Sequence, residues 1–135
     1  MSWLTLSLIT LVFWGVWGFL VKLSGLYLSS KSVAIYTTLG GLIVTAFILF
    51  SMRFKVDNDP KGIIFAIIGG GIGAIGGLFF LYALAKGKAS IVLPLAAMYP
   101  AMTIFLAYIF LQETLSIKQL VGIIFAFLAV FLLAG

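Results

Sequence analysis

The sequence predicts an all-helical integral membrane protein, a bundle of five transmembrane helices. Hydrophobic residues make up 64% of the 135-residue chain and charged residues 8%, whereas a soluble globular domain carries roughly 25% charged residues. A soluble fold of this length cannot bury so much apolar surface. The apolar residues also form blocks close to the roughly 20 residues that a helix needs to cross a bilayer. Lipid must therefore cover much of the chain.

Short polar connectors separate five apolar blocks. The last block is the shortest, and a re-entrant segment is the alternative there. No connector is long enough for a soluble domain, so we expect one domain over residues 1–135 with neighbouring helices packed as antiparallel hairpins. The first block is too long for a cleavable signal peptide, and we expect it to be retained. The expected helices cover residues 3–21, 33–52, 62–84, 91–111 and 119–134.

Helix-start signals stand before four of the blocks. Asp59 followed by Pro60 predicts an N-cap with a proline in the first turn. Ser116 with Gln119 three residues later has the capping-box pattern. The second and fourth helices are predicted to have Ser32 and Ser90 as their N-caps.

The side chains needed for most chemistry are missing. The chain has no Cys and no His, which removes thiol nucleophiles, imidazole acid–base groups and the usual zinc ligands. Its carboxylates are Asp57, Asp59 and Glu113. We therefore expect no enzyme activity, no cofactor and no metal. The basic residues are scattered between apolar blocks, so a nucleic-acid partner is not expected either.

The loop charges leave the orientation in the membrane open. Lys and Arg in short loops normally lie on the cytoplasmic side. With five spans, each side of the membrane receives four of them, so either some of these residues carry little weight or copies insert both ways and pair antiparallel. One side holds Arg53, Lys55, Lys61 and Lys118, and the other holds Lys22, Lys31, Lys86 and Lys88.

Two blocks carry a candidate wall for a solute path. Thr10, Trp14 and Trp17 lie three or four residues apart and share one stripe of the first helix. They favour either aromatic packing between helices or the lining of a cavity, in which the indole rings stack on organic or cationic solutes. In the third block, Gly73 and Gly77 share one face, which predicts either a close helix contact or a backbone wall beside a solute. Tyr82 stands near the end of the same block.

The fourth block is interrupted by Pro94 and Pro100. Each proline removes a backbone hydrogen bond and tends to kink a helix. Spans interrupted by Gly or Pro are the best sequence pointer to a transporter site, although a purely structural kink is the alternative. Tyr99 and Thr103, four residues apart, add polar groups nearby.

The order of several motifs resembles the EamA domain of the drug/metabolite transporter superfamily. The resemblance covers nearly the whole chain, and each motif is loose by itself. Its elements are Phe13-Trp14-Gly15, Tyr82-Ala83-Leu84, the small residues Ala89 and Ser90, Pro100, and the connector of Glu113 with Leu115, Gln119 and Gly122.

This resemblance implies a multi-pass transporter of the cell membrane. Most family members have two such domains with inverted halves, so a single-domain chain implies a homodimer, which the balanced loop charges allow to be antiparallel. The small multidrug resistance proteins are relatives with an essential glutamate in helix one. That helix has no acidic residue here, so their proton exchange chemistry is not carried over.

The leading hypothesis is a half-size secondary transporter or facilitator of small organic solutes such as metabolites, amino acids or drugs. The alternatives are a flippase or accessory subunit for polyprenyl-linked lipids, and a membrane interaction protein that transports nothing. The lipid bilayer and a second copy of the chain are the expected partners. The hypothetical path consists of Thr10, Trp14, Trp17, Gly73, Gly77, Tyr82, Pro94, Tyr99, Pro100 and Thr103.

Overall fold

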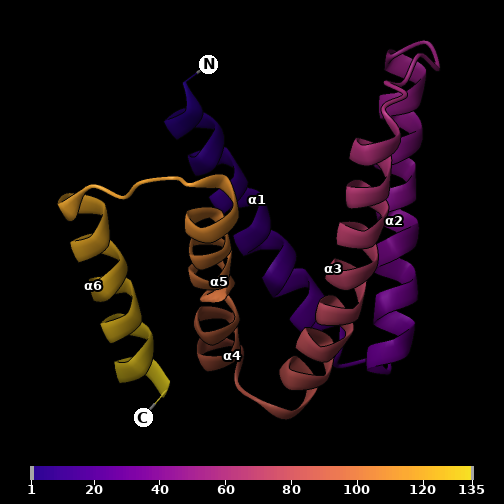
Figure 1. The fold of residues 1–135 in the computed structure, drawn as a ribbon. Coiled ribbons are helices and arrows are strands. Elements are labelled where there is room, and N and C mark those ends of the chain that lie inside the picture. The colour runs from indigo at the N-terminus through magenta and orange to yellow at the C-terminus, as the bar shows by residue number, and fades with distance from the viewer. Residues whose placement is uncertain (1, 135) are drawn as a thin grey trace. The chain divides into compact units, whose positions relative to one another are not determined.

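The structure is a computed structural model that describes residues 2–134. All regular structure in that range is helical, which confirms the predicted all-helical membrane fold (Figure 1). The chain divides into two compact units, Met1–Lys86 and Gly87–Gly135; the expected single domain stays a prediction. The first unit contains α1 (Trp3–Ser24), α2 (Ser30–Ser51) and α3 (Pro60–Lys86). The second contains α4 (Ala89–Ala96), α5 (Tyr99–Leu106), the π-helix η1 (Ala107–Leu111) and α6 (Ile117–Ala134).

Every expected helix corresponds to a helical segment, with ends shifted by a few residues. Among residues 2–134, four segments are long and apolar enough to cross a membrane: α1, α2, α3 and the stretch Ala89–Leu111. The 18 residues of α6 give a helix of roughly 27 Å, slightly less than the roughly 30 Å of hydrocarbon in a bilayer. The last helix is therefore present and is the short one, as the sequence predicts.

Two of the four predicted helix starts are confirmed. The Asp59 Oδ1 accepts a hydrogen bond from the Gly62 N–H at 2.8 Å. At the start of α6, the Gln119 Oε1 accepts from the Ser116 N–H at 2.8 Å, and the Ser116 Oγ accepts from the Gln119 N–H at 3.3 Å. Both carboxamide and hydroxyl thus satisfy N–H groups that a helix start leaves without a helical partner.

The other two predicted N-caps are wrong, by three residues in α2 and by two residues in α4. In α2 the cap is Ser29, whose Oγ accepts from the Ser32 N–H at 3.3 Å. Ser32 therefore lies inside the first turn, because the serine nearest the connector takes the capping position. In α4 the cap is Lys88, which makes no side-chain capping hydrogen bond. Ser90 is the second residue of that helix.

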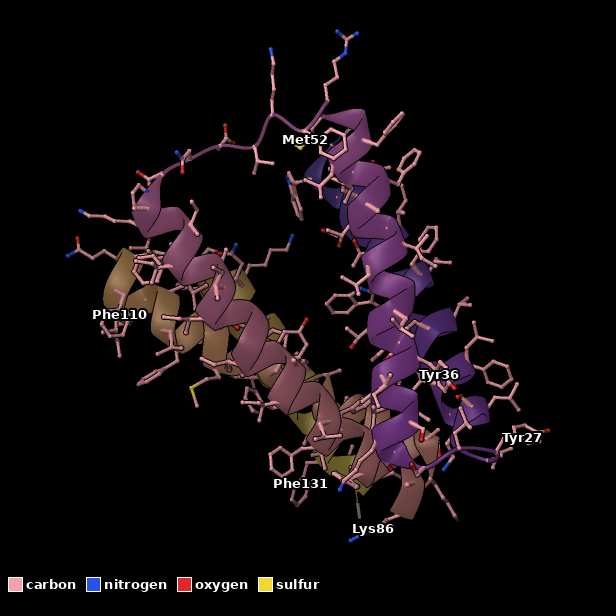
Figure 2. All side chains as sticks on the ribbon, turned by 90° about the vertical axis from the view of Figure 1, so that its right-hand side faces the viewer. Tyr27, Tyr36, Met52, Lys86, Phe110 and Phe131 are labelled. Carbon is pink, nitrogen blue, oxygen red and sulfur yellow. The ribbon has the colours of Figure 1, made fainter. Side chains whose placement is uncertain are left out.

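The three helices of the first unit converge at one end. The buried side chains are Val21 of α1, Val33 of α2, and Leu81 and Leu84 of α3, with exposed fractions of 2–8%. All of them lie near the end of α1, the start of α2 or the end of α3. Figure 2 shows α2 and α3 apart near Met52 and together at the end where Lys86 lies. The packed core of this unit is therefore confined to its Lys86 end.

The second unit is a hairpin with a broken first arm. Residues 97 and 98 separate α4 from α5, and Pro100 lies in the first turn of α5. Proline has no N–H to donate to the Ala96 carbonyl, so the α-helix cannot continue regularly here. The chain then turns at Gln112, which has a left-handed φ of 54°. The returning α6 packs against α4.

The Asp59 cap makes a testable contribution to stability. We expect Asp59→Ala to lower the free energy of unfolding by about 0.5–2 kcal/mol, because the Gly62 N–H loses its acceptor at the start of α3. SDS-induced unfolding of the purified protein in mixed micelles measures this loss.

Asp57→Ala is the matched control. Asp57 lies in the same connector but not at the helix start, so this substitution removes the same charge and no cap. Equal losses in the two variants would contradict the capping role of Asp59.

Candidate functional site

One aromatic contact joins α1 to α3. The rings of Trp17 and Phe80 are stacked, with centroids 5.7 Å apart and planes inclined by 16°. Trp17 still exposes 44% of its surface. The contact lies one turn from the buried Val21 and Leu84, at the edge of the convergence. It therefore marks the point beyond which α1 and α3 separate.

Glycines continue the α3 face beyond that contact. Gly77 and Gly73 lie three and seven residues before Phe80, which places them on its side of the helix. A Cβ added to either glycine would meet no described atom within 4 Å. The close helix contact that their spacing allows is therefore not made within this unit. Their backbone borders open space.

The α1 face opposite these glycines carries the predicted indole stripe. Trp14 lies three residues before Trp17 and is 58% exposed. Thr10 lies one further turn away, and its Oγ1 donates to the Leu6 carbonyl at 3.0 Å. Both helices run toward the converged end, so the stripe and the glycines extend in the same direction from the Trp17–Phe80 contact (Figure 1). We call this open region, bordered by Thr10, Trp14, Gly73 and Gly77, the α1–α3 wedge.

The remaining predicted path residues occupy other positions. Tyr82 is half-buried in α3. It lies two residues after Phe80, toward the carboxyl end of the helix, whereas the wedge glycines precede Phe80. Pro94 lies inside α4, and Tyr99 begins α5 with 56% of its surface exposed. The predicted proline interruption is thus seen as a break of the span rather than as a bend. The role of these residues in a path stays a prediction.

A shallow groove on the second unit includes Thr103. The groove has a volume of about 240 Å³, and Thr103 shares it with Leu106, Ala107, Phe110 and Leu111. Its floor is the junction of α5 with the π-helix Ala107–Leu111. Short π-helical turns occur frequently at functional sites. This element is not predictable from the sequence, because no residue pattern distinguishes a π-turn from an α-helix.

Lys22 differs from the prediction that it lies in a loop: it lies within α1 and is half-buried. Its Nζ donates to the Leu84 carbonyl oxygen at 2.6 Å. Gly18, Val21, Lys22 and Gly25 are spaced as one helix face, and this spacing was the available signal that Lys22 points inward.

Sequence comparisons identify relatives over the full length of the chain. A model of the EamA-like transporter family matches residues 1–135. An uncharacterized protein of Methanocaldococcus jannaschii is 36% identical over 132 residues, which cover 96% of this chain and 93% of that protein. An uncharacterized transporter of Archaeoglobus fulgidus is 30% identical over 130 residues, which cover 96% of this chain and 46% of that protein. No solved structure shows a significant match.

The family match agrees with the helical architecture and the long apolar spans. The Archaeoglobus fulgidus transporter is about twice as long as the matched region, so this chain corresponds to about half of that transporter. The chain belongs to the EamA-like transporter family and is a multi-pass protein of the cell membrane.

Proposed function

We propose that this protein moves small organic solutes, such as metabolites, amino acids or drugs, through the α1–α3 wedge. The observation that carries the proposal is membership of a transporter family together with the face of Gly73 and Gly77 beside the Trp17–Phe80 contact. An added Cβ would meet no neighbouring atom within 4 Å at these two glycines, as at the other glycines from Gly69 to Gly76. Trp14 lies on the same stripe of α1 as Trp17 and is 58% exposed, and apolar walls with a few polar groups are typical of small-molecule sites.

The chemistry of the wedge favours flat or cationic solutes. Indole rings attract organic cations and stack on aromatic groups. Trp14 borders the wedge and is 58% exposed, and Trp17 beside it has one ring face stacked on Phe80. The hydroxyls of Thr10 and of Ser7, three residues before it, and the glycine backbone add polar surface on this face, and the face carries no carboxylate. Aromatic amino acids and organic cations are therefore the first solutes to test.

We further propose that two copies act together. The chain corresponds to about half of the Archaeoglobus fulgidus transporter, and many transporters use two inverted repeats around a site near the midplane. Two antiparallel copies of this chain supply the same symmetry. The Lys and Arg on the two sides number four against four, or four against three when the half-buried Lys22 is left out, and this near balance supports the arrangement.

Filling the wedge should block transport. In proteoliposomes containing the purified protein, we expect Gly77→Leu to lower the initial uptake of a labelled aromatic amino acid or organic cation by roughly tenfold, since small changes of bulk in an apolar pocket have effects of this order. The built Cβ of Gly77 meets no described atom within 4 Å, so folding should be kept.

Gly71→Leu is the matched control, because residue 71 lies two residues from Gly73 and about 200° around the same helix. It should leave uptake unchanged. Equal uptake in both variants would exclude the wedge as the path. Absence of flux for a broad solute panel, with transfer of a polyprenyl-linked lipid probe between leaflets, would favour a flippase instead.

The antiparallel dimer predicts insertion in both orientations. A C-terminal alkaline phosphatase, active outside the cytoplasm, and a C-terminal green fluorescent protein, active inside it, should both give signal. Because single charges decide a balanced orientation, Lys61→Gln and Lys88→Gln should shift the two signals in opposite directions. Strictly one-sided activity in the unmodified protein would refute the antiparallel arrangement.

A further inference from the structure

A small cavity lies where the three helices of the first unit converge. Its volume is about 60 Å³, and roughly 10–15 Å³ on this measure holds one water molecule. Two of its lining side chains are polar, Lys22 and Ser30. The others are apolar and include the buried Val21, Val33 and Leu84. The cavity therefore has room for a small polar group within an apolar surround.

Lys22 is held in this cavity by the end of α3. The last carbonyls of a helix have no partner within it, and the Leu84 carbonyl accepts from the Lys22 Nζ at 2.6 Å. The Ser30 Oγ lies 3.4 Å from the Leu81 carbonyl oxygen, a long hydrogen bond. These two contacts fix both polar side chains beside the same cavity.

The surroundings of the cavity have a surplus of positive charge. Lys31 follows Ser30, and Lys86 follows Ala85, which also lines the cavity. Together with Lys22, this end of the unit has three lysines and no carboxylate. Both carboxylates of the unit belong to the connector at the opposite end, where three basic residues accompany them. The two ends therefore differ in charge.

The helix ends do not cancel this surplus. The carboxyl ends of α1 and α3 contribute roughly −0.5 charge each, and the amino end of α2 contributes roughly +0.5. Their sum is small beside three ammonium groups. The site also lies at the ends of spanning helices, where lysines reach the level of lipid head groups.

We propose that this cavity binds the phosphate of an anionic group, with Lys22 and Ser30 as ligands and with Lys31 and Lys86, which follow lining residues in the sequence, adding positive charge to this end of the unit. Basic pockets between transmembrane helices are suited to anionic head groups. The same chemistry suits a soluble phosphate compound. The experiment below distinguishes a lipid head group from a soluble phosphate as the ligand. This site is distinct from the α1–α3 wedge, which lies beyond the Trp17–Phe80 contact.

The test is the thermal unfolding midpoint of the full-length protein in dodecylmaltoside. We expect dioleoylphosphatidylglycerol to raise the midpoint by about 3 °C or more at saturation, because a ligand of the folded state stabilises it. Dioleoylphosphatidylcholine, which has no net charge, should not. A similar rise with inorganic phosphate at constant ionic strength would assign the site to a soluble compound instead of a lipid.

Three variants distinguish an anion bound at Lys22 from nonspecific attraction of anions to the basic residues of the protein. Lys22→Gln, which keeps a donor for the Leu84 carbonyl, should lose the rise. Lys22→Arg, which keeps the charge, should retain most of it. Lys55→Gln, at the opposite end of the same unit, should behave like the unmodified protein.

If Lys22→Gln does not fold, the two exposed lysines at the same end of the unit supply the test. The double variant Lys31→Gln with Lys86→Gln should at least halve the rise. The proposal is overturned if no anion raises the midpoint, if Lys22→Gln keeps the rise, or if Lys55→Gln loses as much as Lys22→Gln.

Discussion

The hydrogen bond from the Lys22 Nζ to the Leu84 carbonyl oxygen joins the ends of two helices that lie apart elsewhere. A hydrogen bond to a charged group contributes roughly 1.5–3 kcal/mol to stability. Lys22 also brings positive charge to the carboxyl end of α3, which the helix dipole favours. The four buried apolar side chains of the unit line the same cavity as Lys22. The hydrogen bond therefore holds the carboxyl ends of α1 and α3 together at the end of the unit where its buried side chains lie.

Because α1 and α3 are joined at one end, their separation at the other end can differ between conformational states. Beyond the Trp17–Phe80 stack, the α3 glycines meet no described atom of α1 or α2. Relative motion of α1 and α3 about the joint would change the width of the α1–α3 wedge without breaking the core. If the proposed transport uses rocking of the helices, Lys22 lies at the pivot of that motion. An anionic group bound in the cavity beside that pivot would act on the same motion.

The parts of the structure that the sequence predicted depend on local signals. Apolar blocks set the helices, and the Asp59 cap and the Ser116–Gln119 capping box each need residues only three apart. Ser29 was missed as the cap of α2 because three serines, at 29, 30 and 32, offer equivalent local hydroxyls. The choice among them depends on how far α2 extends toward its packed end.

Features of the candidate site that were missed depend on tertiary contacts. The orientation of Lys22 is set by the arrival of the α3 carboxyl end, which no single segment encodes. The π-turn before Gln112 likewise has no composition of its own. By contrast, the stripe of Thr10, Trp14 and Trp17 and the face of Gly73 and Gly77 were predictable by periodicity. What periodicity could not show is that the space between them stays open.

The unequal lengths of the helices connect the protein to the thickness of its membrane. The 27 residues of α3 span roughly 40 Å, whereas α6 spans roughly 27 Å. A bilayer with a hydrocarbon layer of roughly 30 Å must therefore let α3 tilt or protrude while it thins around α6. Hydrophobic mismatch costs only fractions of a kcal/mol per ångström, but the two helices pull in opposite directions. A change in bilayer thickness should therefore change the tilt of α3, which forms one wall of the wedge.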